Sequence, residues 1–134
     1  MARILDIEGI GPEYGKKLQE VGVRSTTRLL RIGTTKHGRE DLAEHTGISE
    51  KLILEWVNLA DLMRVKGIAE EYSDLLEEAG VDTIKELRNR VPDNLYAALV
   101  KVNQEKALVR RLPSRGQVKA WVEHAKKLPP VIRY

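Results

Sequence analysis

The sequence contains no cysteine, which excludes disulfides and thiolate metal sites and makes a cytoplasmic location the default expectation. It also lacks an apolar run near the roughly 18 residues that a membrane-spanning helix needs. The first residues, MARILDIEG, show no small-residue cleavage site of a signal peptide. We therefore expect a protein that has no membrane partner.

Signatures of catalysis and cofactor binding are missing as well. Neither a Walker loop nor a dinucleotide glycine fingerprint is present, and no nucleophile has a base beside it. The three histidines, His37, His45 and His124, show no metal-ligand spacing and no acidic companion at i+3 or i+4 that would form a site. We therefore expect a protein that is not an enzyme and has no cofactor, no metal and no small-molecule substrate.

Charge is spread unevenly along a chain whose composition, 42% hydrophobic and 32% charged, is typical of a globular protein. Residues 94–134 carry 9 basic and 2 acidic side chains, a net charge of +7, whereas residues 1–63 and 64–93 have net charges of −1 and −3. Such a basic segment is typical of a protein with a polyanionic partner. A solvated surface is the alternative interpretation.

Two stretches of the chain are nearly the same. Residues 6–23, DIEGIGPEYGKKLQEVGV, resemble residues 64–81, RVKGIAEEYSDLLEEAGV, and a shift of 58 makes nine of 24 positions identical between 7–30 and 65–88. A second block, 49–60, pairs with 114–125 at a shift of 65. The pattern predicts two tandem copies, residues 1–63 and 64–134, with seven extra residues in the second copy around PDNLYAALVKVN.

The periodicity predicts an all-α protein with about eight to ten short helices. Pro12 suits the first turn of a helix, and Gly22 suits its end because glycine tolerates a positive φ. Trp56 and Trp121 lie on repeated apolar faces, so we expect core positions for both rather than stacking platforms for bases. Because the join LADLMRV is apolar, we expect the two copies to pack as one compact body.

The stretch Gly9-Ile10-Gly11 before the helix at Pro12 predicts a tight hairpin. We expect Ile10 to anchor the hairpin in the core. The first amides of the following helix then have no carbonyl partner, and they lie at the positive end of the helix dipole. This arrangement can bind a phosphate oxygen and reads the nucleic-acid backbone rather than the bases.

These residues carry a resemblance to known proteins. Residues 7–30, IEGIGPEYGKKLQEVGVRSTTRLL, resemble the helix-hairpin-helix motif of many DNA repair, recombination and replication proteins. With the continuation DLAEHTGISEKLILEWVNLA and the late segment NQEKALVRRLPSRGQVKAWVEHAKKL, the chain is similar, over about residues 5–128, to a bacterial family of unknown function built from tandem paired units of this kind. The resemblance implies binding of DNA without sequence specificity. A glycosylase related to this motif needs a larger helical body than this chain can form.

The four expected hairpins differ in how many of the hairpin glycines they retain. The second, Gly67-Ile68-Ala69, is followed by two glutamates that compete with a phosphate, so we assign it a structural role. The third, at residues 46–49, keeps one glycine, and the fourth, at residues 112–114, keeps none but lies among basic side chains. The candidate nucleic-acid-binding residues are Gly9, Ile10, Gly11, Lys16, Lys17, Arg110, Arg111, Arg115 and Lys119.

Two hypotheses about function remain open. One is a non-catalytic module that binds nucleic acid weakly and without sequence specificity, with DNA rather than RNA as the expected partner. The other is a protein-interaction or scaffold domain in which the hairpins are only structural. Fold analogy favours the first, whereas the small net charge and the eroded hairpins favour the second.

Overall fold

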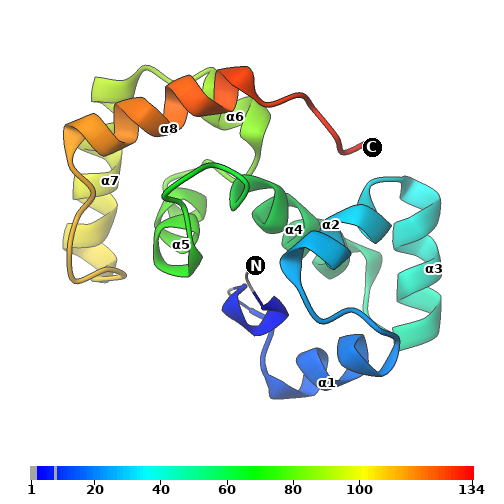
Figure 1. Cartoon of the computed structure of the whole chain (residues 1–134). Coiled ribbons are helices and arrows are strands. Elements are labelled where there is room, and N and C mark those ends of the chain that lie inside the picture. The colour runs from blue at the N-terminus through cyan, green and yellow to red at the C-terminus, as the bar shows by residue number, and fades with distance from the viewer. Residues whose placement is uncertain (1–2, 8) are drawn as a thin grey trace. The chain divides into compact units, whose positions relative to one another are not determined.

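The computed structural model describes residues 3–7 and 9–134 (Figure 1). This part of the chain contains eight α-helices, one 3-10 turn and no strand, so the expected all-α class is confirmed. The chain divides into two compact units, Met1–Asp61 with Val131–Tyr134, and Leu62–Pro130. The division at residue 63 that the sequence suggests is close to this boundary, but it assigns residues 131–134 to the second copy.

The first unit begins with a 3-10 turn, η1 (Ile4–Asp6), and continues with α1 (Pro12–Glu20), α2 (Thr26–Gly33), α3 (Lys36–Thr46) and α4 (Glu50–Leu62). Helix α4 begins after Ser49, whose hydroxyl accepts the amide of Leu52 at 3.2 Å. Its apolar face is buried along its length and forms much of the core: Ile53, Trp56, Val57 and Ala60. A Cβ on Gly33 of α2 would lie 2.3 Å from Val57 Cγ2, so a glycine is needed where these two helices approach.

The second unit contains α5 (Glu70–Glu78), α6 (Ile84–Arg88), α7 (Pro92–Lys106) and α8 (Arg115–Lys127). Helix α8 packs against both α6 and α7, and α5 packs against α7. Val118, Trp121, Val122 and Ala125 form the inner face of α8 and lie in one continuous core.

The same local contacts occur in each unit, with Leu18, Val23 and Tyr14 matched 58 residues later and Trp56 matched 65 residues later. The Val23 amide donates to Leu18 O at 2.9 Å, and the Val81 amide donates to Leu76 O at 2.8 Å. Tyr14 lies against Trp56 with ring centroids 5.3 Å apart, and Tyr72 lies against Trp121 at the same distance. Both tryptophans are 2% exposed, which confirms the expectation that they occupy matching core positions.

The extra residues of the second unit lie in two places. Helix α7 has 15 residues where α3 has 11, and the loop before α8 spans residues 107–114 where the loop before α4 spans only 47–49. The sequence-based placement around PDNLYAALVKVN accounts for the longer helix but not for the longer loop. Sequence similarity does not show where a helix ends, and here α7 ends at Lys106 because the next residue, Ala107, has a φ of +50°.

Candidate nucleic-acid interface

The first hairpin contains two residues that the fold itself requires. Gly9 has a φ of +93°, and a Cβ there would lie 3.4 Å from Trp56 Nε1. Ile10 is 5% exposed, and its amide donates to Ile7 O at 3.2 Å. The side chain and the amide of Ile10 are therefore engaged within the protein, so Ile10 supports the hairpin from inside.

Unlike Gly9, Gly11 has no structural reason to be a glycine. Its φ is −81°, which any residue can adopt, and within the described chain nothing lies within 4 Å of the Cβ that a substitution would add. It is the N-cap of α1 and, in the part of the structure that is described, no side chain caps this helix. Gly15 makes the first helical hydrogen bond, to Gly11 O at 2.8 Å.

The amides at this helix start are the ones that a ligand could use. Pro12 has no amide hydrogen, so among residues 9–134 the amides of Gly11, Glu13 and Tyr14 are the first-turn donors that have no helical acceptor. Lys16 is exposed and Lys17 is half-buried on the same helix, whereas the exposed Glu13 reduces the local positive potential. The arrangement combines a few outward amides with two cations.

The second hairpin keeps the structural features but not the open helix start. Gly67 has a φ of +91°, and a Cβ there would lie 3.0 Å from Trp121 Nε1. Ala69 is the N-cap of α5, and Glu70 and Glu71 occupy the first turn. Their carboxylates favour the same amides that an anion would need, which agrees with the structural role expected for this hairpin.

In the second unit, the loop 107–114 is held firmly in place and presents basic side chains. Asn103 on α7 clamps it, because its Oδ1 accepts the Val109 amide at 2.9 Å and its Nδ2 donates to Val109 O at 3.1 Å. The Tyr72 hydroxyl donates to Arg111 O at 3.0 Å. The guanidinium groups of Arg110 and Arg111 are left exposed on a fixed backbone.

The start of α8 is more occupied than the sequence indicated. Ser114 and Gln117 form a capping box, with the Gln117 amide donating to Ser114 Oγ at 3.1 Å and the Ser114 amide donating to Gln117 Oε1 at 2.8 Å. Arg115 lies 3.6 Å from Asp93 Oδ1 and 4.8 Å from the ring centroid of Tyr96. Lys119 is exposed one turn further along. This hairpin can therefore attract an anion through side chains rather than through free amides.

The candidate residues fall into two groups, one in each unit. Gly9, Ile10, Gly11, Lys16 and Lys17 belong to the first unit. Arg110, Arg111, Arg115 and Lys119 belong to the second. Each group is a local cluster formed by a loop and the helix that follows it.

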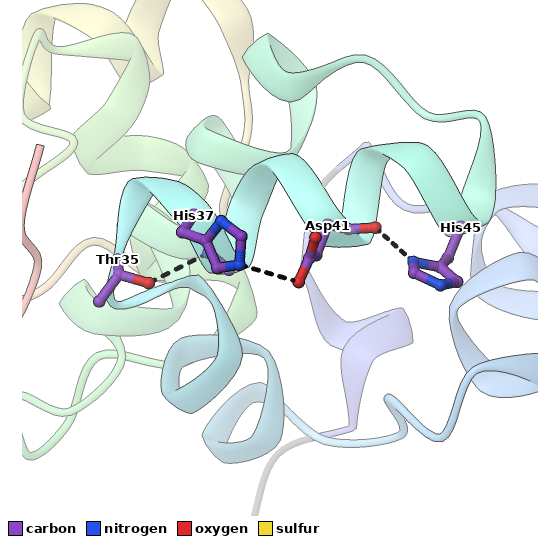
Figure 2. A network of polar contacts seen from close by, with 5 residues as sticks. Thr35, His37, Asp41 and His45 are labelled. Atoms are coloured by element: carbon purple, nitrogen blue, oxygen red, sulfur yellow. Dashed lines mark hydrogen bonds and ion pairs between the residues drawn. The ribbon is translucent and has the colours of Figure 1, made fainter.

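One of the histidines, His37, does have an acidic residue four positions along, and the two side chains form a pair on α3. Figure 2 shows Asp41 between His37 and His45 on α3: His37 Nε2 lies 3.4 Å from Asp41 Oδ2, and His45 Nδ1 lies 2.8 Å from the backbone oxygen of Asp41. A spacing of four residues places these side chains on one helix face, so the sequence did contain the signal. His124 has a structural role, because its Nδ1 accepts the Lys66 amide at 3.0 Å.

Sequence reasoning also overlooked an acidic group on α5. Carboxylate oxygens of Asp74, Glu77 and Glu78 lie within 4.8 Å of one another. The Lys106 ammonium on α7 forms an ion pair with Glu78, and this hydrogen bond and charge raise the pKa of Lys106. The spacing of three and four residues along one helix is the signal that could have revealed the group.

Comparison with known proteins identifies a family. A sequence model of the family described as "Domain of unknown function (DUF4332)" matches residues 8–128. The chain belongs to this family. The match confirms the expected resemblance to a family of unknown function. No curated protein and no solved structure shows significant similarity to the chain. Among residues 3–7 and 9–134, no helix is both long enough and apolar enough to cross a bilayer.

Proposed function

We propose that this DUF4332 protein is a non-catalytic module that binds the phosphates of nucleic acid, with DNA as the partner, without reading sequence. The observation that carries the proposal is Gly11. Its φ of −81° and the open space around it give the fold no need for glycine, yet it lies at an uncapped helix start. A residue without a side chain at that point lets a phosphate approach the amides of Gly11 and Glu13 closely.

In this interpretation the two hairpin clusters are paired helix-hairpin-helix elements with different roles. The Gly9–Gly11 hairpin supplies geometric contacts to a phosphate through its amides, and Lys16 and Lys17 add charge. The loop with Arg110 and Arg111 supplies most of the electrostatic attraction, because these side chains are exposed on a clamped backbone. Contacts of these kinds position the protein on the nucleic acid and carry no sequence information.

A second candidate function is a protein-interaction or scaffold domain. The observation that favours it is the second hairpin, where Ala69, Glu70 and Glu71 replace the open and neutral helix start of α1. The contacts of Arg115 with Asp93 and Tyr96 also favour this alternative, because they already engage its guanidinium. In this case the hairpins survive as structural turns alone.

A charge placed at the first hairpin tests the proposed phosphate contact. Gly11→Asp puts a carboxylate where the phosphate would lie, and Gln19→Asp makes the same kind of change at an exposed position near the other end of α1. We expect Gly11→Asp to weaken binding to a mixed-sequence duplex by about tenfold or more, since a hydrogen bond to a charged group contributes about 1.5–3 kcal/mol. Gln19→Asp should change the affinity for the duplex by less than about threefold. Fluorescence anisotropy measures both, and circular dichroism checks that both variants are folded.

A matched pair of double variants tests the basic loop. Arg110→Ala with Arg111→Ala should flatten the dependence of log K on log salt by nearly two units, because each phosphate contact contributes about 0.9. Lys126→Ala with Lys127→Ala removes the same charge from exposed positions at the end of α8 and should leave the slope nearly unchanged. Equal effects of the two pairs would mean a diffuse charge effect and would favour the interaction-domain alternative.

A further inference from the structure

The last four residues of the chain occupy a specific site on the first unit. After α8 the chain passes through Pro129 and Pro130, and Val131–Tyr134 then belongs to the unit formed by residues 1–61. The Arg133 amide donates to Thr34 O at 2.7 Å, and the Tyr134 hydroxyl donates to Asn58 Oδ1 at 2.8 Å. We call these four residues the tail.

The centre of the site is Arg39 on α3, which is only 4% exposed. Its Nη1 donates to Gly33 O at 2.7 Å, its Nη2 donates to Arg133 O at 3.0 Å, and its guanidinium lies 5.9 Å from the ring centroid of Tyr134. A buried guanidinium is costly unless its donors are satisfied, so the tail carbonyl fills a need that the first unit creates. Asn58, 8% exposed, is a second buried polar group that a tail residue satisfies.

The contacts define what the site recognises. It binds the main-chain donor and acceptor of one residue, and it binds the ring and hydroxyl of the tyrosine that follows. Val131 and Ile132 are half-buried, whereas Arg133 and Tyr134 are exposed, Tyr134 to 67%, so the tyrosine is held by its hydroxyl and one face of its ring. Any non-helical segment with apolar residues, one unspecified residue and a tyrosine presents the same groups.

The site extends beyond the tail. A pocket of about 330 Å³ is lined by Lys36, Arg39, Glu50, Lys51, Leu54 and Tyr134. Three of these residues are cationic and one is anionic. Because Tyr134 lines this pocket, an acidic group attached next to the tyrosine would lie near the lysines.

We propose that Thr34, Arg39 and Asn58 form a peptide-docking site on the first unit, and that the chain's own tail occupies it in cis. The partner that fits is a segment that presents apolar residues, a tyrosine and an adjacent acidic group. The tail competes as a linked ligand, because it is joined covalently to the first unit through the second unit. A partner in trans therefore binds only when the tail is released or outcompeted.

The test uses the full chain and a fluorescein-labelled peptide, PPVIRY, with a free carboxylate. Tyr134→Ala removes the tail's anchor but leaves the site intact, whereas Arg133→Ala changes an exposed tail residue and keeps the anchor. We expect saturable anisotropy binding to Tyr134→Ala, and at least about tenfold weaker apparent binding to wild type and to Arg133→Ala because the tail competes. A peptide ending in phenylalanine should bind Tyr134→Ala about threefold to tenfold more weakly, because it lacks the hydroxyl that donates to Asn58.

Two further variants make the outcome decisive. In the Tyr134→Ala chain, Asn58→Ala should abolish the preference for tyrosine over phenylalanine, and an amidated peptide should bind more weakly than the free acid. Absence of saturable binding to a folded Tyr134→Ala chain at millimolar peptide overturns the proposal. If circular dichroism shows that Tyr134→Ala is unfolded, Tyr134→Phe replaces it, and peptide binding no stronger than that of wild type overturns the proposal equally.

Discussion

At the scale of single residues, glycines of similar sequence context have different reasons to be glycine. Gly9 and Gly67 have φ values of +93° and +91°, and each lies beside the indole nitrogen of a buried tryptophan. Gly11 has neither constraint. This contrast separates what the hairpin needs in order to fold from what it offers to a ligand.

The contrast predicts different stabilities for two alanine variants. Gly9→Ala should lower the free energy of unfolding by about 1–2 kcal/mol, because an L-residue is strained at this positive φ. Gly11→Ala should cost less than about 1 kcal/mol, since alanine is only a poorer N-cap than glycine. Urea unfolding monitored by circular dichroism measures both. Equal losses in the two variants would contradict the assignment of different roles.

At the scale of elements, the helices begin with different N-terminal caps. The first turn of some helices also brings charged side chains close to one another. Thr83 caps α6 by accepting the amide of Glu86 at 3.0 Å. Burial, together with the charge and hydrogen bond of Asp82, raises the pKa of the Glu86 carboxyl, and the charge of Arg90 opposes this shift. The folded protein therefore disfavours the ionised form of this glutamate.

This direction gives a pH-dependent prediction for Glu86→Gln. A raised pKa in the folded state contributes stability below the unfolded value, and that contribution is lost as the pH rises through the folded value. At pH 7 the ionised Glu86 therefore carries a cost, and the variant should be more stable than wild type by a few tenths of a kcal/mol, since the group is largely exposed. The gain should shrink as the pH falls through the raised folded value, and it should be nearly gone below about 4.3, the ordinary value.

Thermal unfolding at several pH values measures this effect, and Asp82→Asn provides the control. The Asp82→Asn protein already lacks the charge of Asp82 that raises the pKa of Glu86. Adding Glu86→Gln to it should therefore stabilise the protein less than adding the substitution to wild type. A gain that is the same at pH 3 and pH 7 would mean that the substitution acts through something other than ionisation.

Much of each element could be predicted from the sequence, because the determining features are local. The helical periodicity, Pro12 at a helix start, the turn at Gly22 and the two buried tryptophans follow from spacing alone. The His37–Asp41 pair was also readable at a spacing of four.

Other features of the candidate site could not be predicted from the sequence, because their partners are distant along the chain. Arg39 and Arg133 are separated by 94 residues, and no periodic pattern links them. The contacts of Arg115 with Asp93 and Tyr96 likewise depend on how α7 and α8 pack. Basic residues can be counted in a sequence, but their engagement with acids and aromatic rings requires the tertiary structure.

At the scale of the whole molecule, we propose that each unit contributes a cluster that contacts phosphate and that neither contributes a catalytic centre. We predict that the protein leaves abasic, nicked and mismatched duplexes unchanged. The measurement is gel analysis of labelled duplexes after incubation with stoichiometric protein. Cleavage that is absent from a mock preparation would show that the protein is an enzyme.

The most direct test of the central claim is a titration of wild-type protein with duplex and single-stranded DNA at several salt concentrations. Arg110, Arg111 and Lys119 provide three exposed cations, and the exposed Lys16 and half-buried Lys17 bring the number of cations to five. With about 0.9 per phosphate neutralised, we expect log K to fall with log salt at a slope of about −3 to −5 on duplex DNA. Binding should be weak and indifferent to sequence. The absence of salt-dependent binding to either form at low ionic strength would contradict the account and leave the interaction-domain alternative in its place.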